Sequence, residues 1–248
     1  MSGHSKWSTI KRQKGLNDAK RGQVFTKLAN AITIAVREGG GSGDPASNFK
    51  LRLAMDTARA VNMPNVNIQR AIDRGTGKAG GAAFETVVYE GYGPGKVAII
   101  IEAATDNKNR TTPEVRGTIE KNGGTFASPG AVSWMFTDVG MVTVAKDGKS
   151  LDDVFEAAVE VGADDVEDVG DSVEVYTKPA DVEKVKNALA EKGFNVQSAE
   201  LFKKATTTAS ITDKAEAEKV LAFVEKLEDL DAVQKVYSNF DIPDNLLN

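Results

Sequence analysis

The chain has 248 residues, of which 41% are hydrophobic and 27% charged, so a globular protein with a buried core is expected. It contains no cysteine and a single histidine, which excludes a disulfide framework, a thiol nucleophile and the usual cysteine- or histidine-based zinc sites. The longest aliphatic run, residues 97–101, is too short to span a membrane and no secretory signal is recognisable, so a cytoplasmic protein is predicted.

Charge is distributed unevenly along the chain. Residues 1–80 contain 14 Lys and Arg against 5 Asp and Glu, a net charge of +9, whereas the remainder contains 17 against 31, a net charge of −14. Such a division directs a polyanion towards the N-terminal third. The first 21 residues are the most basic, and the rings of His4 and Trp7 lie among their cations. This composition favours nucleic-acid binding, with a solvated chain end as the alternative.

Three amphipathic helices are predicted at residues 17–38, 45–61 and 64–75, packed as a small bundle. In the third, Asn67, Arg70 and Arg74 fall within roughly a 60° sector beside the apolar stripe. Amide and guanidinium groups on one exposed face can read base edges or hold phosphates, although an ordinary solvated face is the alternative. The candidate nucleic-acid-binding residues are His4, Lys6, Trp7, Lys11, Arg12, Lys14, Lys20, Arg21, Lys27, Asn67, Arg70 and Arg74.

The glycine-rich segment 75–81 formally matches a dinucleotide-binding pattern, but it follows a helix and not a strand, so we interpret it as a flexible linker. Beyond it the pattern becomes mixed α and β. Two strands are predicted at 86–92 and 96–104, then a polar loop at 105–114 and a helix opened by Pro113. A short strand is predicted at 133–136.

The next segment predicts the order β-α-β-β-α-β, which is typical of a ferredoxin-like domain. Its strands are expected at 141–145, 165–169, 172–177 and 196–202, and its helices at 151–161 and 180–192. The last part of the chain predicts a strand, a helix at 213–230 and a strand at 233–240, which lack partners unless they return to the strands before residue 137.

The predicted fold class is therefore multidomain α+β, with an N-terminal three-helix bundle followed by two α/β domains. We expect a basic helical domain at 1–81, including an N-terminal arm and the linker. A discontinuous α/β domain is expected at 82–137 plus 206–248, and the ferredoxin-like domain is inserted at 138–205.

No combination of side chains indicates catalysis, so the chain is not expected to be an enzyme and no cofactor, metal or small-molecule substrate is predicted. The acidic cluster Asp164, Asp165, Glu167, Asp168 and Asp171 does not fit a calcium loop and is interpreted as a solvated surface. The polar loop before the Pro113 helix could form a second contact site for anions, or could simply cap that helix. Its candidate residues are Asn107, Lys108, Asn109 and Arg110.

Eight short motifs occur in one order along nearly the whole chain. They are GHSKW at 3–7, DAKRG at 18–22, FTKL at 25–28, NMP at 62–64, RAIDRGTG at 70–77, YEGYGPG at 89–95, TDNKNRT at 105–111 and YSNF at 237–240. Together they resemble the YebC/PmpR family of probable transcriptional regulators, which includes the mitochondrial translational activator of cytochrome oxidase subunit I.

The resemblance implies three domains, and it implies that the basic family positions fall on Lys6, Lys11, Lys14, Lys20, Arg21 and Lys27. The chain departs from the expected His-Arg pair, having Arg12 and Gln13 instead, which keeps the charge but not the histidine.

The resemblance implies a nucleic-acid-binding regulator of gene expression, most directly a DNA-binding transcriptional regulator acting on promoter DNA. One alternative is a translation factor that binds ribosomal RNA on the ribosome and eases synthesis through difficult stretches such as consecutive prolines. The rings of His4 and Trp7 suit unpaired bases in RNA, and no strong major-groove reader is apparent. A further alternative is a protein-interaction scaffold that uses the acidic α/β domains. No membrane partner is expected.

Overall fold

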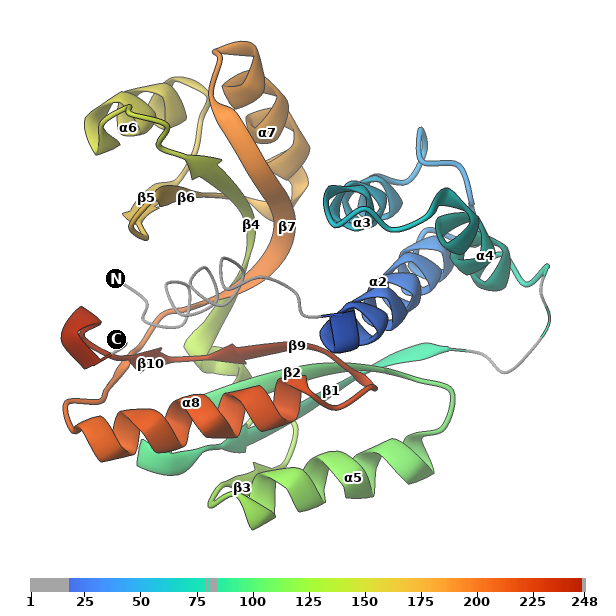
Figure 1. Cartoon of the computed structure of the whole chain (residues 1–248), viewed down its shortest axis with the longest axis vertical. Helices are drawn as coiled ribbons and strands as arrows, with labels where there is room; N and C mark the ends of the chain where they lie inside the picture. Colours follow the sequence, from blue (N-terminus) through green and yellow to red (C-terminus); the bar gives the residue numbers. More distant parts are fainter. Residues whose placement is uncertain (1–17, 79, 81–83, 247–248) are drawn as a thin grey trace.

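The computed structural model describes residues 18–78, 80 and 84–246. Its N-terminal region is helical, with α2 at Asp18–Glu38, α3 at Phe49–Ala60 and α4 at Asn65–Gly75 (Figure 1). Helix α3 begins four residues later than predicted, because Asn48 and not Pro45 marks its start. The Asn48 side chain accepts a hydrogen bond from the Leu51 N–H at 3.1 Å and donates one to the Ala35 carbonyl of α2 at 2.8 Å.

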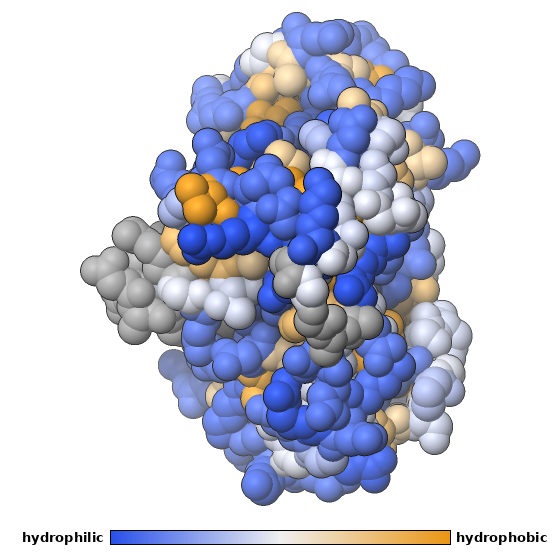
Figure 2. All heavy atoms as spheres, turned by 90° about the vertical axis from the view of Figure 1, so that its right-hand side faces the viewer, coloured by the Kyte–Doolittle hydropathy of each residue, from blue (hydrophilic) through white to orange (hydrophobic). Residues whose placement is uncertain are grey.

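The three helices bury a common apolar core that includes Ile32, Val36, Leu51 and Ile68. The face of the molecule in Figure 2 is mostly polar, and its hydrophobic residues form small separate patches. Gly75 ends α4, as the helix predicted at 64–75 has it, and packs against α2, so the segment interpreted as a linker begins after Gly75. A Cβ atom added to Gly75 would lie 2.7 Å from the Val36 Cβ.

Replacing Gly75 with leucine should therefore force α4 away from α2 and destabilise the protein by about 2 kcal/mol. Urea unfolding measures this change. Gly117→Ala in α5 is the matched control, because a Cβ there meets nothing within 4 Å and alanine should stabilise that helix by about 0.5–1 kcal/mol. Equal stability of the Gly75 variant and the wild type would show that the two helices are not in this close contact.

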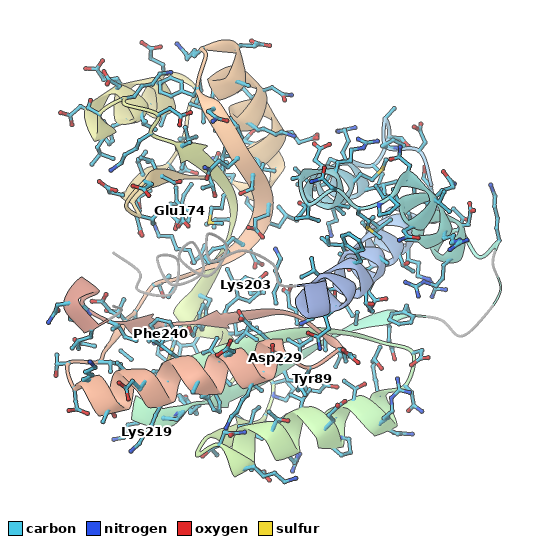
Figure 3. All side chains as sticks on the ribbon, in the orientation of Figure 1. Tyr89, Glu174, Lys203, Lys219, Asp229 and Phe240 are labelled. Carbon is cyan, nitrogen blue, oxygen red and sulfur yellow. The ribbon has the colours of Figure 1, made fainter. Side chains whose placement is uncertain are left out.

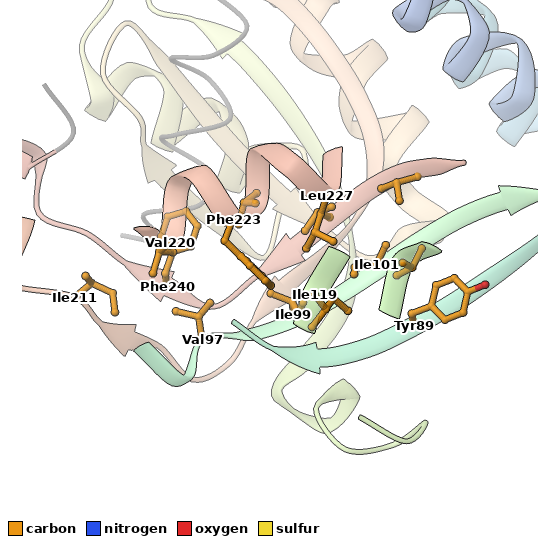
Figure 4. Close-up of a cluster of buried hydrophobic side chains, with 14 of the residues drawn as sticks. Tyr89, Val97, Ile99, Ile101, Ile119, Ile211, Val220, Phe223, Leu227 and Phe240 are labelled. Atoms are coloured by element: carbon orange, nitrogen blue, oxygen red, sulfur yellow. The ribbon is translucent and has the colours of Figure 1, made fainter. Parts of the chain in front are cut away.

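The first sheet has the strand order β3-β1-β2-β9, and every neighbouring pair in it is antiparallel. Its strands are β1 at Glu85–Tyr92, β2 at Ala98–Thr105, β3 at Thr125–Ala127 and β9 at Val233–Ser238. Helices α5 (Lys108–Lys121) and α8 (Lys214–Glu228) cover one face of this sheet and enclose a core with Ile99, Ile101 and Phe223 (Figure 4). A short parallel pair, β8 (Ala209–Ser210) with β10 (Phe240–Asp241), lies at the end of this core.

Two predictions for this part of the chain were wrong. The segment predicted as a polar loop is largely the start of α5, because Asn107 caps the helix and the hydroxyls of Thr105 and Thr111 bond at 2.8 Å. Pro113 consequently lies inside α5 and does not open it. The strand predicted at 133–136 is instead a 3₁₀ turn, η2 (Ser133–Met135), because the Glu90 carboxylate accepts hydrogen bonds from backbone N–H groups of this segment.

The second sheet has the order β5-β6-β4-β7, again with antiparallel neighbours. Strands β4 (Phe136–Ala145), β5 (Asp165–Asp168), β6 (Ser172–Thr177) and β7 (Asn195–Ala205) alternate with helices α6 (Leu151–Glu160) and α7 (Val182–Glu191) as predicted. This is the strand order of a ferredoxin-like domain. The predicted α+β class, with a helical region followed by two sheet units, is confirmed.

The three parts of the molecule contact one another through specific side chains. Arg52 of α3 forms an ion pair with Glu183 of α7, and Lys186 of α7 lies 2.5 Å from Asp56 of α3. Lys203 of β7 projects towards the first sheet, where its Nζ lies 3.9 Å from Glu102 of β2 (Figure 3). Strand β9 pairs with β2 and not with the second sheet. The division into 1–81, 82–137 plus 206–248, and 138–205 requires this pairing, and we retain the division as a proposal.

Candidate nucleic-acid interface

Most residues of the predicted basic arm precede the part of the chain that the structure describes. His4, Lys6, Trp7, Lys11, Arg12 and Lys14 lie outside the described residues, and Lys20 and Arg21 belong to the first turn of α2, where only the backbone is described. The role of all eight residues stays a prediction. The described residues of the helical region that could bind nucleic acid lie on α2 and α4.

The three predicted residues of α4 lie together on one groove between α2 and α4. This open groove has a volume of about 460 Å³. Asn67, Arg70 and Arg74 line it from α4. The remaining lining residues are Phe25, Thr26, Ala29, Met63 and Ala71. Polar and cationic groups thus share the groove with an apolar surface that includes an aromatic ring.

Arg74 does not lie on a solvated face as the helical spacing predicted. Its Nε donates to Thr33 Oγ1 at 3.1 Å and its Nη2 donates to Asn30 Oδ1 at 2.9 Å, so the guanidinium is held against α2. The ring of Phe84 lies 4.9 Å from its Cζ. Burial lowers the pKa of Arg74, and the charge of the nearby Arg37 lowers it further. Arg70, one helical turn away, is exposed.

The arginines of this region form no ion pair with a carboxylate of the described residues. Arg37 donates from Nη1 to the Phe84 carbonyl at 3.2 Å, and its buried Nε has no hydrogen-bond partner. Within the described part of the chain, no Asp or Glu forms an ion pair with Arg37, Arg70 or Arg74. Because partly buried cations without carboxylate partners are unfavourable, an anion bound here would offset their charge. Of these three arginines, Arg70 and Arg74 line the groove, so the groove offers two cations without carboxylate partners to an anion.

The other predicted contacts lie elsewhere and do not line this groove. Lys27 donates to the backbone carbonyl of Glu228 at the end of α8. At the start of α5, Lys108 lies 2.8 Å from Glu85 and Arg110 lies 3.0 Å from Asp106. Asn107 caps the helix by accepting from the Arg110 N–H, and Asn109 is exposed. These cations already have intramolecular partners, so a second contact site at Asn107–Arg110 remains only a proposal.

Sequence reasoning missed Phe25, Met63 and Arg37. Phe25 and Ala29 lie four residues apart on α2, and this spacing could have indicated that they share one face of that helix. The lack of acidic partners for Arg37 has no signal in the sequence, because it depends on which helices meet.

The acidic cluster before β6 is largely neutralised within the fold. Lys204 lies 2.6 Å from Asp165 and 2.8 Å from Glu167, and Lys146 lies 2.8 Å from Asp168. Burial lowers the pKa of Lys204, but its hydrogen bonds to the two carboxylates raise it above the ordinary value.

Across the described ranges, no group of three or more His, Cys, Asp or Glu side chains could hold a metal ion. Nor does any described helix have the length and apolar character needed to cross a bilayer.

Fold and groove together define a multidomain α+β protein with a helical region carrying a cationic groove. The family model described as the TACO1/YebC protein N-terminal domain matches residues 5–78, and the model for the TACO1/YebC second and third domain matches residues 84–240. The chain belongs to the TACO1/YebC family.

Relatives of similar length support this assignment. The chain is 54% identical to a "Probable transcriptional regulatory protein" of Chloroflexus aurantiacus, over 100% of this chain and 98% of the relative. It is 55% identical to a protein of the same name from Roseiflexus castenholzii, over 99% and 97%. The crystal structure of a conserved hypothetical protein from Aquifex aeolicus is similar with a TM-score of 0.84 and 42% identity, covering 92% of this chain and 93% of that one.

Proposed function

We propose that the protein is a nucleic-acid-binding regulator of gene expression that acts as a DNA-binding transcriptional regulator. The relatives named as probable transcriptional regulatory proteins support the regulatory part of this proposal. The observation that carries the binding part is the group of arginines without carboxylate partners in a region of net charge +9. Phosphates are the natural partner of such a surface.

We further propose that the protein is cytoplasmic and that it acts by binding and not by catalysing a reaction. The family's regulatory name supports an action by binding. The basic helical region would contact the nucleic acid, while the acidic sheet units, which carry most of the net −14 of residues 81–248, would face away from it.

A second candidate is a translation factor that binds ribosomal RNA. The half-buried ring of Phe25 favours it, because aromatic side chains recognise unpaired bases, which structured RNA presents more often than duplex DNA. The Phe25 ring is a single feature of the groove, whereas the relatives carry a transcriptional name, so the translation factor remains the second candidate.

One experiment tests the proposal and ranks the two candidates. The full chain is mixed with a labelled promoter-length DNA duplex and, separately, sedimented with ribosomes, both at one fixed salt concentration because phosphate contacts are salt-dependent. A transcriptional regulator should prefer the duplex, and a translation factor should sediment with the ribosomes. Binding to neither would contradict the proposal and favour a protein scaffold that uses the acidic units.

A further inference from the structure

We propose that the groove between α2 and α4 binds one unpaired nucleotide of a nucleic-acid strand, with its phosphate on Arg70 and Arg74 and its base against Phe25. This inference rests only on the nucleic-acid-binding part of the proposed function, which both candidates share, and within that part it favours a target with unpaired bases, such as structured RNA, over a promoter duplex. It predicts a preference for strands with unpaired bases over fully paired duplex.

The phosphate position follows from how the two arginines are held. Thr33 and Asn30 occupy two N–H donors of Arg74 and fix its guanidinium, so its remaining donors are oriented before a ligand arrives. Arg70 is exposed beside it and forms no ion pair with any described residue. One guanidinium held by hydrogen bonds and one exposed guanidinium can together contact a phosphate from two directions.

The base position follows from the rest of the lining. The ring of Phe25 is half-buried, and Met63 and Ala71 are buried beneath the same groove. An aromatic ring on an apolar floor suits the flat face of a base. The side-chain amide of Asn67 lines the groove and hydrogen-bonds to no other described residue, so it is available for a base edge, as asparagine is for adenine.

The shape of the site favours an unpaired nucleotide over a duplex. Reading a paired base requires a protein element that projects into a DNA groove. Here the cationic and aromatic groups line a hollow between two helices, and only a base that has left its stack can enter a hollow. The volume of about 460 Å³ lies within the range of small-ligand pockets.

The test measures binding of the full-length protein to a 12-nucleotide single strand carrying 2-aminopurine, and to the matching duplex. Arg70→Ala should weaken single-strand binding about tenfold and reduce the fluorescence change. Phe25→Leu keeps an apolar side chain against the helical core but removes the ring, so it should lose the fluorescence change with only a small loss of thermal stability. Arg59→Ala is the matched control, since this exposed arginine of α3 lies outside the groove and the net charge changes equally.

The results separate this inference from the proposed function. If the wild type binds nucleic acid but the Arg70 and Phe25 variants bind the single strand as the Arg59 variant does, the groove does not hold a nucleotide and the proposed function stands. If the wild type prefers duplex to single strand, the inference is likewise overturned. If the wild type binds neither strand type, the proposed function itself fails.

Discussion

Reversing the charge of Lys11 and Lys14 together, by Lys11→Glu with Lys14→Glu, is expected to weaken nucleic-acid binding roughly 50-fold at 0.1 M salt. The estimate follows from counterion release, in which each phosphate contact contributes a slope of about −0.9 to the dependence of log K on log salt for duplex DNA. Loss of two contacts should therefore also reduce the magnitude of that slope by about 2. Binding titrations at several salt concentrations measure both quantities.

The matched control reverses two cations of the acidic units, Lys184→Glu with Lys219→Glu. Both lysines are exposed, on α7 and α8 respectively, and Lys219 projects away from the sheets (Figure 3). The net charge changes by the same amount, so a loss of binding that came only from overall charge would appear in both double variants. An unchanged affinity in the Lys11 and Lys14 variant at physiological salt would show that the N-terminal arm is not part of the interface.

Removing the carboxylate of Glu90 is expected to have the largest effect on stability. Glu90 lies on β1, is 6% exposed, and accepts hydrogen bonds from the backbone N–H groups of Gly130, Val132 and Ser133 at 2.8, 2.7 and 3.0 Å. Glu90→Ala leaves these donors without an acceptor next to the first sheet, which should cost about 3 kcal/mol. Urea unfolding at pH 7 measures the loss.

The contribution of Glu90 should also depend on pH. Burial raises the pKa of Glu90, but the three backbone hydrogen bonds outweigh it and lower the pKa overall. Since the folded pKa lies below the unfolded value, the stabilisation is present above the unfolded pKa and is lost as the pH falls through the folded pKa. The stability difference between wild type and Glu90→Gln should therefore shrink on acidification below about pH 4.

Glu114→Gln, which makes the same change at an exposed position of α5, is the matched control for Glu90→Gln. A constant difference in stability between wild type and Glu90→Gln from pH 7 down to the acid transition would contradict the role given to the carboxylate.

The Glu90 carboxylate also explains why the η2 segment is a turn. Its loss should therefore increase proteolysis near Trp134, which is 66% exposed.

The elements that could be predicted from sequence are those whose signals are local. Helical spacing located α2 and α4 to within about one residue, and the alternation of strands and helices from β4 to β7 identified the ferredoxin-like order. In two of the places where prediction failed, a distant partner decided the structure. Asn48 caps α3 while bonding to α2, and Glu90 on β1 organises a turn 40 residues later.

The candidate site was predictable in part for the same reason. The spacing of Asn67, Arg70 and Arg74 on one helix placed them together, as the groove shows. The spacing could not reveal that Arg74 is held by Thr33 and Asn30, or that Phe25 completes the groove, because these contacts depend on the packing of α2 against α4. How far Arg74 is buried, and whether its charge is compensated, depend on how the helices pack against each other.

The N-terminal helical region is the surface that we propose binds nucleic acid. Amide hydrogen exchange of the full chain, measured with and without a bound nucleic acid, shows which helices become protected. We expect slower exchange in α2 and α4 on binding, and no change in α6 and α7. Protection confined to the second sheet and its helices, with α2 and α4 unchanged, would contradict it.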